Sequence, residues 1–313
     1  MTDRNLRNCL LVVNPRSGTS GKGRIIKHAI EHMLASGWNV EAAYTERPGH
    51  ATEIADNAAA DGLDAVVAVG GDGTVNETAR ALCNTSSTLG IIPMGSGNGL
   101  ARHLNIPMDP MKAIRVITDG HAQQCDYCTA NNRPFFCTFG MGFDAAVSDR
   151  FASRPDRRGL ANYVRSVFEE LVSFRPDEYT IECGDRTLTE RAFLIACCNA
   201  SQYGNNAFIA PQASVTDGLM DITVMHSGNL LQQAINGIDV MLGAIHEGAR
   251  VHTFRAERVT ITRKNGGPVH LDGDPAQMGQ RIVVRCHRGA LRVFSPGEMK
   301  ITPVLTPLGL KTD

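Results

Sequence analysis

The segment AVVAVGGDGTVNE at residues 65–77 limits the possible fold more than any other feature of the sequence. Its first residues, Ala65–Gly70, form an apolar run, and glycines at positions 70, 71 and 73 lead directly into a helical pattern. A strand without polar alternation is covered on both faces, as in the middle of a parallel sheet. The segment therefore predicts an α/β domain that binds a ligand at the carboxyl end of this strand.

The first 120 residues repeat the same alternation of strand and helix. Buried-strand patterns end in polar or glycine-rich loops, and an amphipathic or alanine-rich helical pattern follows each of them. The predicted strands are residues 9–15, 39–45, 64–71 and 89–95. The predicted helices are residues 22–36, 50–62, 74–84, 98–104 and 110–120. This order predicts a parallel sheet with helices on both faces.

Beyond residue 120 the pattern changes to strands separated by glycines and polar residues. Two helical patterns interrupt them, at 160–172 and 229–246. This mixture is typical of a mostly antiparallel β domain. Because 313 residues are many for one hydrophobic core, we expect two domains. The match GMGFDA at 140–145 to a dinucleotide pattern is a weak signal, because no helical pattern follows it.

Three glycine-rich loops follow strands of the predicted parallel sheet. They are Asn14–Gly18, Gly70–Asn76 and Gly95–Gly99. Glycines allow the backbone to approach a phosphate closely, and a following helix offers free N–H groups. The first loop does not fit the Walker pattern and the third does not fit G-x-G-x-x-G. Together the loops predict a polyphosphate site, for which a metal ion and a base are also needed.

The candidate carboxylates for such a metal or base lie in both parts of the chain. They are Asp72, Glu77, Asp144, Asp217, Asp221, Asp272 and Asp274. The last two flank Gly273 in the segment HLDGDP at residues 270–275. This segment has the composition of a hairpin tip. However, the next predicted strand begins only at Arg281, which is too far for a two-residue loop. A turn, a metal site and the acid/base part of an active site all remain open.

Composition excludes some classes of function. The formal net charge of −1 argues against a nucleic-acid binder, which normally carries a basic excess. The nine cysteines show no disulfide spacing, and Cys125 and Cys128 lie on one predicted strand, so reduced thiols in a cytoplasmic protein are expected. No apolar stretch approaches the roughly 18–20 residues that span a bilayer. The apolar run near the start is too short for a signal peptide and ends at Asn14-Pro15. Any contact with a membrane is expected at its surface.

Six motifs in order carry a resemblance to a known family. They are NPRSG, VGGDGTVNE, IPMGSGNGLARHL, GMGFDAAV, YGNNAFIAPQASVTDGLMDI and LDGD. The chain resembles the diacylglycerol kinase catalytic family, bacterial lipid kinases related to the sphingosine and ceramide kinases. The resemblance implies a phosphofructokinase-like α/β nucleotide-binding domain (1–125) and a β-sandwich lipid-substrate domain (126–300). It implies an ATP site in the cleft between them, and we expect the tail (301–313) to pack back on the first domain.

The resemblance also assigns site residues. Those expected to contact ATP are Asn14, Pro15, Arg16, Ser17, Gly18, Thr45, Gly70, Gly71, Asp72, Gly73, Thr74, Asn76, Gly95 and Ser96. The side chain of Asp217 and the carbonyls of Ser214 and Leu219 resemble a structural Mg²⁺ site, whose oxygen-only ligands suit that ion. Family members commonly have Asp-Gly-Glu where this chain has Asp272-Gly273-Asp274. We expect Asp272 to be the base and Asp274 to assist it, with the reverse left open.

The resulting expectation is an ATP- and Mg²⁺-dependent kinase. It would transfer the γ-phosphate to the hydroxyl of a lipid, of diacylglycerol or sphingoid type, at the inner face of the cytoplasmic membrane. Two alternatives remain. One is a soluble-metabolite kinase of the NAD kinase or phosphofructokinase type, and the other is a nucleotide-binding regulator without catalysis. The sequence does not identify the lipid, and it leaves a homodimer open.

Overall fold

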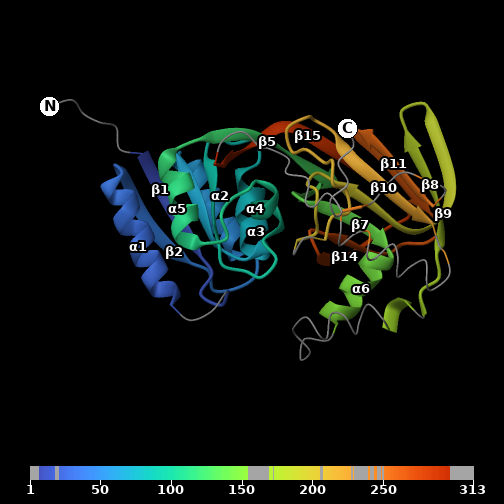
Figure 1. The fold of residues 1–313 in the computed structure, drawn as a ribbon, viewed down its shortest axis with the longest axis horizontal. Coiled ribbons are helices and arrows are strands. Elements are labelled where there is room, and N and C mark those ends of the chain that lie inside the picture. The colour runs from blue at the N-terminus through green and yellow to red at the C-terminus, as the bar shows by residue number, and fades with distance from the viewer. Residues whose placement is uncertain are drawn as a thin grey trace, which may run out of the picture. The chain divides into compact units, whose positions relative to one another are not determined.

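The computed structural model describes residues 7–17, 21–153, 169–171, 173–204, 207–226, 228, 239, 243–244, 248 and 250–296. The chain forms two compact units. Among the described residues, the first unit comprises residues up to 127 together with 288–296, and the second comprises residues from 128 to 287. Strands β5 (Ala122–Ala130) and β15 (Arg281–Phe294) run from one unit into the other (Figure 1).

The first unit contains a parallel sheet in the order β4-β3-β1-β2. Its strands are β1 (Arg7–Val13), β2 (Trp38–Tyr44), β3 (Ala65–Gly70) and β4 (Thr88–Pro93). Every residue of β3 and β4 is buried, which explains their unbroken apolar sequences. The end of β15 extends the sheet, since Arg292 pairs in parallel with Thr88 of β4.

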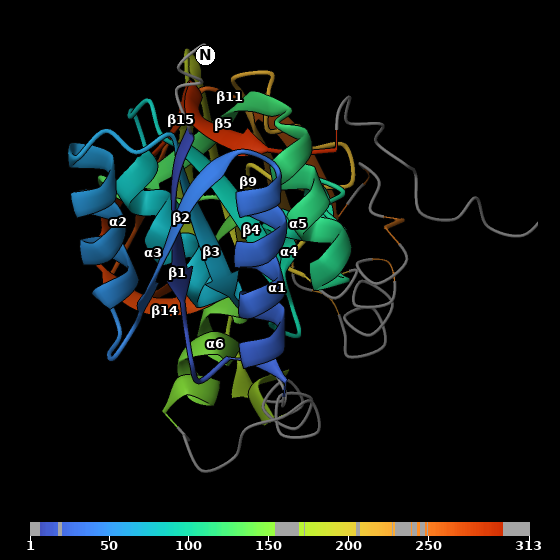
Figure 2. The same ribbon diagram turned by 90° about the vertical axis from the view of Figure 1, so that its left-hand side faces the viewer.

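Helices cover both faces of this sheet (Figure 2). On one face α1 (Lys22–Ala35) packs beside α5 (Pro110–Asp119), and on the other α2 (His50–Ala60) packs beside α3 (Asp72–Leu82). The short α4 (Gly99–His103) follows the loop after β4. The core under α1 and α5 contains the alternate side chains of β1 and β3, with Met33 and Ile117 from the helices. The predicted α/β domain is therefore confirmed.

The second unit is built mainly of antiparallel strands. They are β6 (Arg133–Phe135), β7 (Thr138–Gly142), β8 (Asp177–Cys183), β9 (Arg186–Cys198), β10 (Met220–His226), β11 (Val251–Ala256), β12 (Arg258–Arg263), β13 (Gly267–Leu271) and β14 (Asp274–Met278). The long β9 pairs with β8 through its first half and lies between β7 and β10 through its second. Its two halves thus belong to the two layers of a β-sandwich.

One hydrophobic core fills this sandwich. Large side chains from strands of both layers are fully buried in it, among them Phe135, Phe139, Ile195, Ile222 and Ile261. The predicted fold class, an α/β domain followed by a β-sandwich domain, is therefore confirmed. The exact boundary at residues 125/126 stays a prediction.

Two expectations about the second unit were wrong. The first was that the next strand begins too far away for a two-residue loop. Strand β14 begins at Asp274 and pairs with β13, so Asp272 and Gly273 form a two-residue hairpin turn. Both turn residues have positive φ, 52° and 86°, as a type I′ turn requires. A helix, α6 (Phe143–Ala152), also follows β7 directly, where no helical pattern was recognised.

The predicted helices 160–172 and 229–246 lie largely outside the described residues, and the tail 301–313 lies wholly outside them. In the described part of the chain, no helix is both long and apolar enough to cross a membrane. None of the nine cysteines, all of which lie in the described part of the chain, forms a disulfide bond. Cys125 and Cys128 are buried on β5, as the sequence indicated.

Candidate functional site

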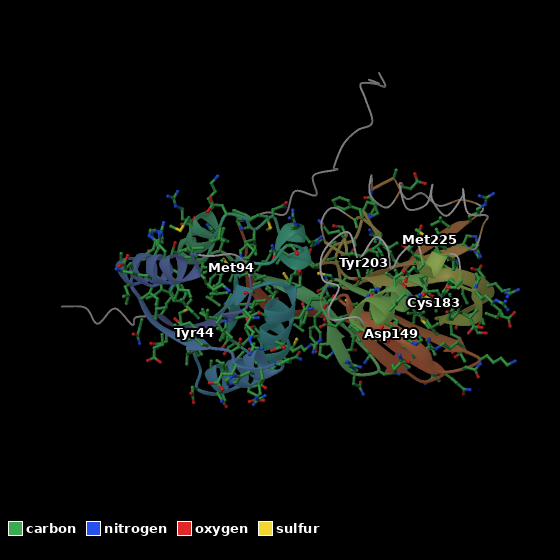
Figure 3. All side chains as sticks on the ribbon, turned by 90° about the horizontal axis from the view of Figure 1, so that it is seen from below. Tyr44, Met94, Asp149, Cys183, Tyr203 and Met225 are labelled. Atoms are coloured by element: carbon green, nitrogen blue, oxygen red, sulfur yellow. The ribbon has the colours of Figure 1, made fainter. Side chains whose placement is uncertain are left out.

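The loops that the sequence singled out meet at the carboxyl edge of the parallel sheet. Backbone hydrogen bonds tie the residues that follow β1, β2 and β4 to the end of a neighbouring strand. These bonds are Asn14 N to Val69 O (3.1 Å), Thr45 N to Val13 O (2.8 Å) and Met94 N to Gly70 O (2.7 Å). Tyr44 at the end of β2 and Met94 just after β4 are labelled in Figure 3. The predicted convergence of the loops is therefore present within the first unit.

The first loop is held closed by its own polar side chains. The Asn14 amide donates to Thr74 Oγ1 at 3.1 Å, which ties the loop after β1 to α3. The Lys22 ammonium donates to the carbonyl of Asn14 at 2.6 Å, to the Ser17 hydroxyl at 3.0 Å and to the Ser17 carbonyl. Lys22 was not among the residues predicted from the sequence. Arg16 is exposed on this loop, and Gly18 lies outside the described residues.

Glycines bring the second and third loops into backbone contact. A Cβ added at Gly95 would lie 2.7 Å from the Cα of Gly71, and one added at Gly70 would lie 2.5 Å from Thr74 Oγ1. A side chain at Gly95 would push the second and third loops apart, and one at Gly70 would displace Thr74 within the second loop. The glycines thus serve loop packing, a requirement separate from the approach of a phosphate.

Asp72 links the same two loops through its carboxylate. Its Oδ2 accepts the N–H of Asn98 at 2.8 Å, and its Oδ1 accepts the N–H of Gly99 at 2.7 Å. Glu77 is similarly engaged, since its carboxylate accepts the N–H groups of Gly49 and Ala51 at the start of α2. A negative charge at a helix N-terminus is stabilising. These two carboxylates therefore position loops and a helix.

The beginning of α3 presents a further feature that suits an anion. Its first backbone bond runs from Val75 N to Gly71 O at 3.1 Å, so the preceding N–H groups lie outside the helical ladder. Gly73 is exposed, Gly71 is half-buried, and Thr74 and Asn76 are buried beneath them. Free N–H groups and the positive end of the helix dipole favour phosphate at such a position.

In the second unit, Asp272 is anchored by the backbone. Its Oδ1 accepts the N–H groups of Cys137 at 2.7 Å and Thr138 at 2.9 Å, and its Oδ2 accepts that of Phe136 at 2.8 Å. Burial raises the pKa of Asp272 to about 6, although these donors and His270 oppose the shift. Both carboxylate oxygens are therefore engaged in holding the turn. Asp274, at the first residue of β14, is exposed.

A half-buried polar network lies next to this turn. Asp144 Oδ2 accepts from the hydroxyl of Tyr203 at 2.9 Å and lies 3.0 Å from Nε2 of His270. On its other side, His270 Nδ1 accepts the N–H of Gly273 at 3.4 Å. A Cβ at Gly140, which pairs with His270 across the strands, would collide with both His270 and Asp144. The glycine of the GMGFDA motif thus makes room for this pair.

The predicted Mg²⁺ residues Ser214, Asp217 and Leu219 lie in the loop that leads into β10. Asp217 Oδ1 accepts the N–H of Leu219 at 3.0 Å, and its Oδ2 lies 3.6 Å from Nη1 of Arg255. Arg255 also contacts Asp221 at 3.0 Å. The buried Oδ2 of Asp221 makes no hydrogen bond within the described residues. This oxygen-rich, negatively charged loop fits a hard cation, with Arg255 supplying part of the compensating charge.

Two family models match the chain, one for each unit. Residues 8–130 match the diacylglycerol kinase catalytic domain. Residues 137–295 match the YegS C-terminal NAD kinase beta sandwich-like domain. The two matches place the α/β unit and the β-sandwich unit together in a family of kinases. The chain belongs to the diacylglycerol kinase family of lipid kinases, as the motifs indicated.

Relatives match over most of their length. The diacylglycerol kinase of Staphylococcus epidermidis is 30% identical, over 84% of this chain and 84% of that protein. The diacylglycerol kinase of Bacillus subtilis (strain 168) is 26% identical, over 94% and 98%. A protein of Chromohalobacter salexigens named "Probable lipid kinase YegS-like" is 27% identical, over 83% of this chain and 85% of that protein.

A solved structure titled as a diacylglycerol kinase from Bacillus anthracis str. Sterne has the same fold. It matches with a TM-score of 0.75 and covers 93% of this chain and 97% of that one. The identity of 20% supports a common fold and no finer statement.

Proposed function

We propose that this protein transfers the γ-phosphate of ATP to the hydroxyl of a lipid at a membrane surface. The observation that carries the proposal is the meeting of the glycine-rich loops at one sheet edge, in a chain of the diacylglycerol kinase family. Phosphoryl transfer depends mainly on positioning and on neutralising phosphate charge, and loops rich in backbone N–H groups serve both.

In this proposal the first unit binds ATP. The N–H groups at the start of α3 and the side chain of Arg16 face the phosphates. Lys22 and Asp72 keep the loops in shape by the hydrogen bonds described above. The remaining proposed nucleotide contacts are those predicted from the motifs, namely Asn14, Pro15, Ser17, Gly18, Thr45, Gly70, Gly71, Gly73, Thr74, Asn76, Gly95 and Ser96.

The second unit supplies the base and a metal site. We assign the base to Asp274, because Asp272 already accepts three backbone hydrogen bonds while Asp274 is exposed at the same turn. Asp274 would take the proton of the acceptor hydroxyl, and Asp272 would fix the turn that carries it. Asp217 with the carbonyls of Ser214 and Leu219 would hold Mg²⁺, whose charge would offset the acidic loop.

A transfer assay with labelled ATP tests the function. The acceptors should include diacylglycerol, a sphingoid base, ceramide and a total lipid extract, with NAD and fructose phosphates beside them. We expect that a lipid acceptor becomes labelled and that this labelling requires Mg²⁺. Label on NAD or a sugar phosphate would instead support the soluble-metabolite kinase. Tight ATP binding without transfer to any acceptor would support the regulator.

A further inference from the structure

A second group of ligand-forming side chains lies in the second unit. Glu190 of β9, His226 at the end of β10 and His252 of β11 come from three adjacent strands, since β10 pairs with both neighbours. One ligand atom from each lies within 4.8 Å of the other two. Met225, labelled in Figure 3, marks the end of β10 beside His226. The bulge at Met225/His226 shifts the register where the group forms.

The distances within this group suit a single metal ion. His226 Nε2 lies 3.2 Å from Glu190 Oε2, and His252 Nδ1 lies 3.0 Å from Glu190 Oε1. Ligand atoms around tetrahedral zinc lie roughly 3.3 Å apart, because the zinc–ligand bonds are about 2.0–2.1 Å long. Two imidazoles and a carboxylate are a common ligand set of zinc sites that keep a fourth position for water.

The other nitrogen of His226 orients the ring. Its Nδ1 lies 3.3 Å from the carbonyl oxygen of Arg191, which can only accept a hydrogen bond. That contact assigns the proton of the neutral imidazole to Nδ1 and directs the Nε2 lone pair toward Glu190. Among the described residues, His226 Nε2 and Glu190 Oε2 are both buried atoms that make no hydrogen bond. A cation between these two atoms would satisfy both of them, whether it is the proton of a charged His226 or a metal ion.

The group is also open to solvent on one side. The His252 side chain is 41% exposed and borders an open groove of about 580 Å³ that is otherwise lined by residues such as Ile181, Leu188 and Phe254. An ion can therefore reach the ligands, and a water can complete its coordination. We propose that Glu190, His226 and His252 bind Zn²⁺ and that the ion links β9, β10 and β11. The proposal does not depend on the kinase activity.

Titration of the metal-free full chain with Zn²⁺ tests this site. Binding is measured by competition with a chromophoric chelator, in excess Mg²⁺ and with the thiols kept reduced. We expect one Zn²⁺ per chain and a rise in the midpoint temperature of unfolding. The variants Glu190→Gln, His226→Gln and His252→Gln should each weaken binding more than about 10-fold, since even outer-shell partners contribute about 10- to 100-fold.

The matched control is the double variant His28→Gln/His32→Gln. These residues lie one turn apart on α1 with stacked rings, so they form another histidine pair. The control should bind Zn²⁺ as the wild type does. Circular dichroism establishes that each variant is folded, and His252→Gln, at the most exposed ligand, should perturb the fold least. Absence of binding to the wild type, unchanged binding in all three variants, or loss of binding in the α1 control would overturn the proposal.

Discussion

At the turn between β13 and β14, two aspartates two residues apart have opposite surroundings. Asp272 is half-buried and accepts hydrogen bonds from three backbone N–H groups, whereas Asp274 is exposed. A proton acceptor in catalysis must reach its substrate. Identical side chains are therefore assigned different roles by position alone.

The first prediction concerns Asp274. The variant Asp274→Asn should bind ATP normally but lose about 10²- to 10⁴-fold in kcat, because a positioned general base contributes about that much. Asp274→Glu keeps a carboxylate and should retain measurable turnover. Steady-state kinetics with the lipid acceptor found in the transfer assay give the kcat of each variant. Wild-type turnover in Asp274→Asn would remove Asp274 from the role of base.

The second prediction concerns the anchoring of Asp272. In Asp272→Asn an amide NH₂ replaces an acceptor oxygen and faces backbone donors, so the second unit should lose about 1–3 kcal/mol of stability. Denaturant unfolding followed by circular dichroism measures this loss. Asp185→Asn, in the exposed turn between β8 and β9, is the control and should stay within about 0.5 kcal/mol of the wild type. Equal stabilities for the two variants would contradict the anchoring role.

At the scale of elements, the third prediction concerns the contact between the loops after β3 and β4. Gly95→Ala places a Cβ 2.7 Å from the Gly71 Cα and 2.9 Å from Asn98 Oδ1. Forcing atoms into a packed site costs typically 1–3 kcal/mol, and the displaced loops should bind ATP less tightly. Calorimetric titration with ATP and thermal unfolding measure the two effects.

The control for this prediction is Gly23→Ala. Gly23 lies in α1, and an added Cβ there would meet no atom within 4 Å. Alanine is the better helix former, so this variant should be as stable as the wild type or up to about 1 kcal/mol more stable. If Gly95→Ala behaved like Gly23→Ala, the loops would not depend on this close approach.

The elements missed by sequence analysis have identifiable physical causes. Strand β14 contains Pro275, which is tolerated because β14 is the edge of its sheet, yet proline within a run argues against a strand. Helix α6 begins immediately after the glycines of β7 and has no clear apolar face. By contrast, β3 and β4 were predicted well because strands buried on both faces leave an unbroken apolar sequence.

For the molecule as a whole, the sequence located the loops but did not determine the contacts within them. The positions of Asn14, Gly70 and Gly95 follow from the ends of parallel strands, which sequence periodicity reveals. The roles of Lys22 and Asp72 depend on where flexible side chains find backbone partners, which spacing along the chain does not encode. The zinc proposal likewise rests on the pairing of β9, β10 and β11, which brings distant residues together.

The fourth prediction concerns the pH dependence of unfolding in this two-unit chain. Burial lowers the pKa of His103, in the first unit, to about 4, against about 6.5 for an unfolded histidine. The unfolded state therefore binds more protons between these values. The stability contributed by a neutral His103 is complete above about pH 6.5 and is lost as the pH falls toward 4, by up to about 3 kcal/mol.

Trp38, the single tryptophan, allows this effect to be followed in the first unit, where it is buried. Denaturant unfolding monitored by its fluorescence should show stability falling from pH 6.5 to pH 4.5. Because other groups titrate in the same range, the decisive quantity is the difference between variants. His103→Gln should reduce the loss of stability on acidification, whereas His28→Gln, at an exposed position on α1, should leave it unchanged. Parallel pH profiles for the wild type and His103→Gln would show that His103 is not the group that makes the first unit sensitive to acid.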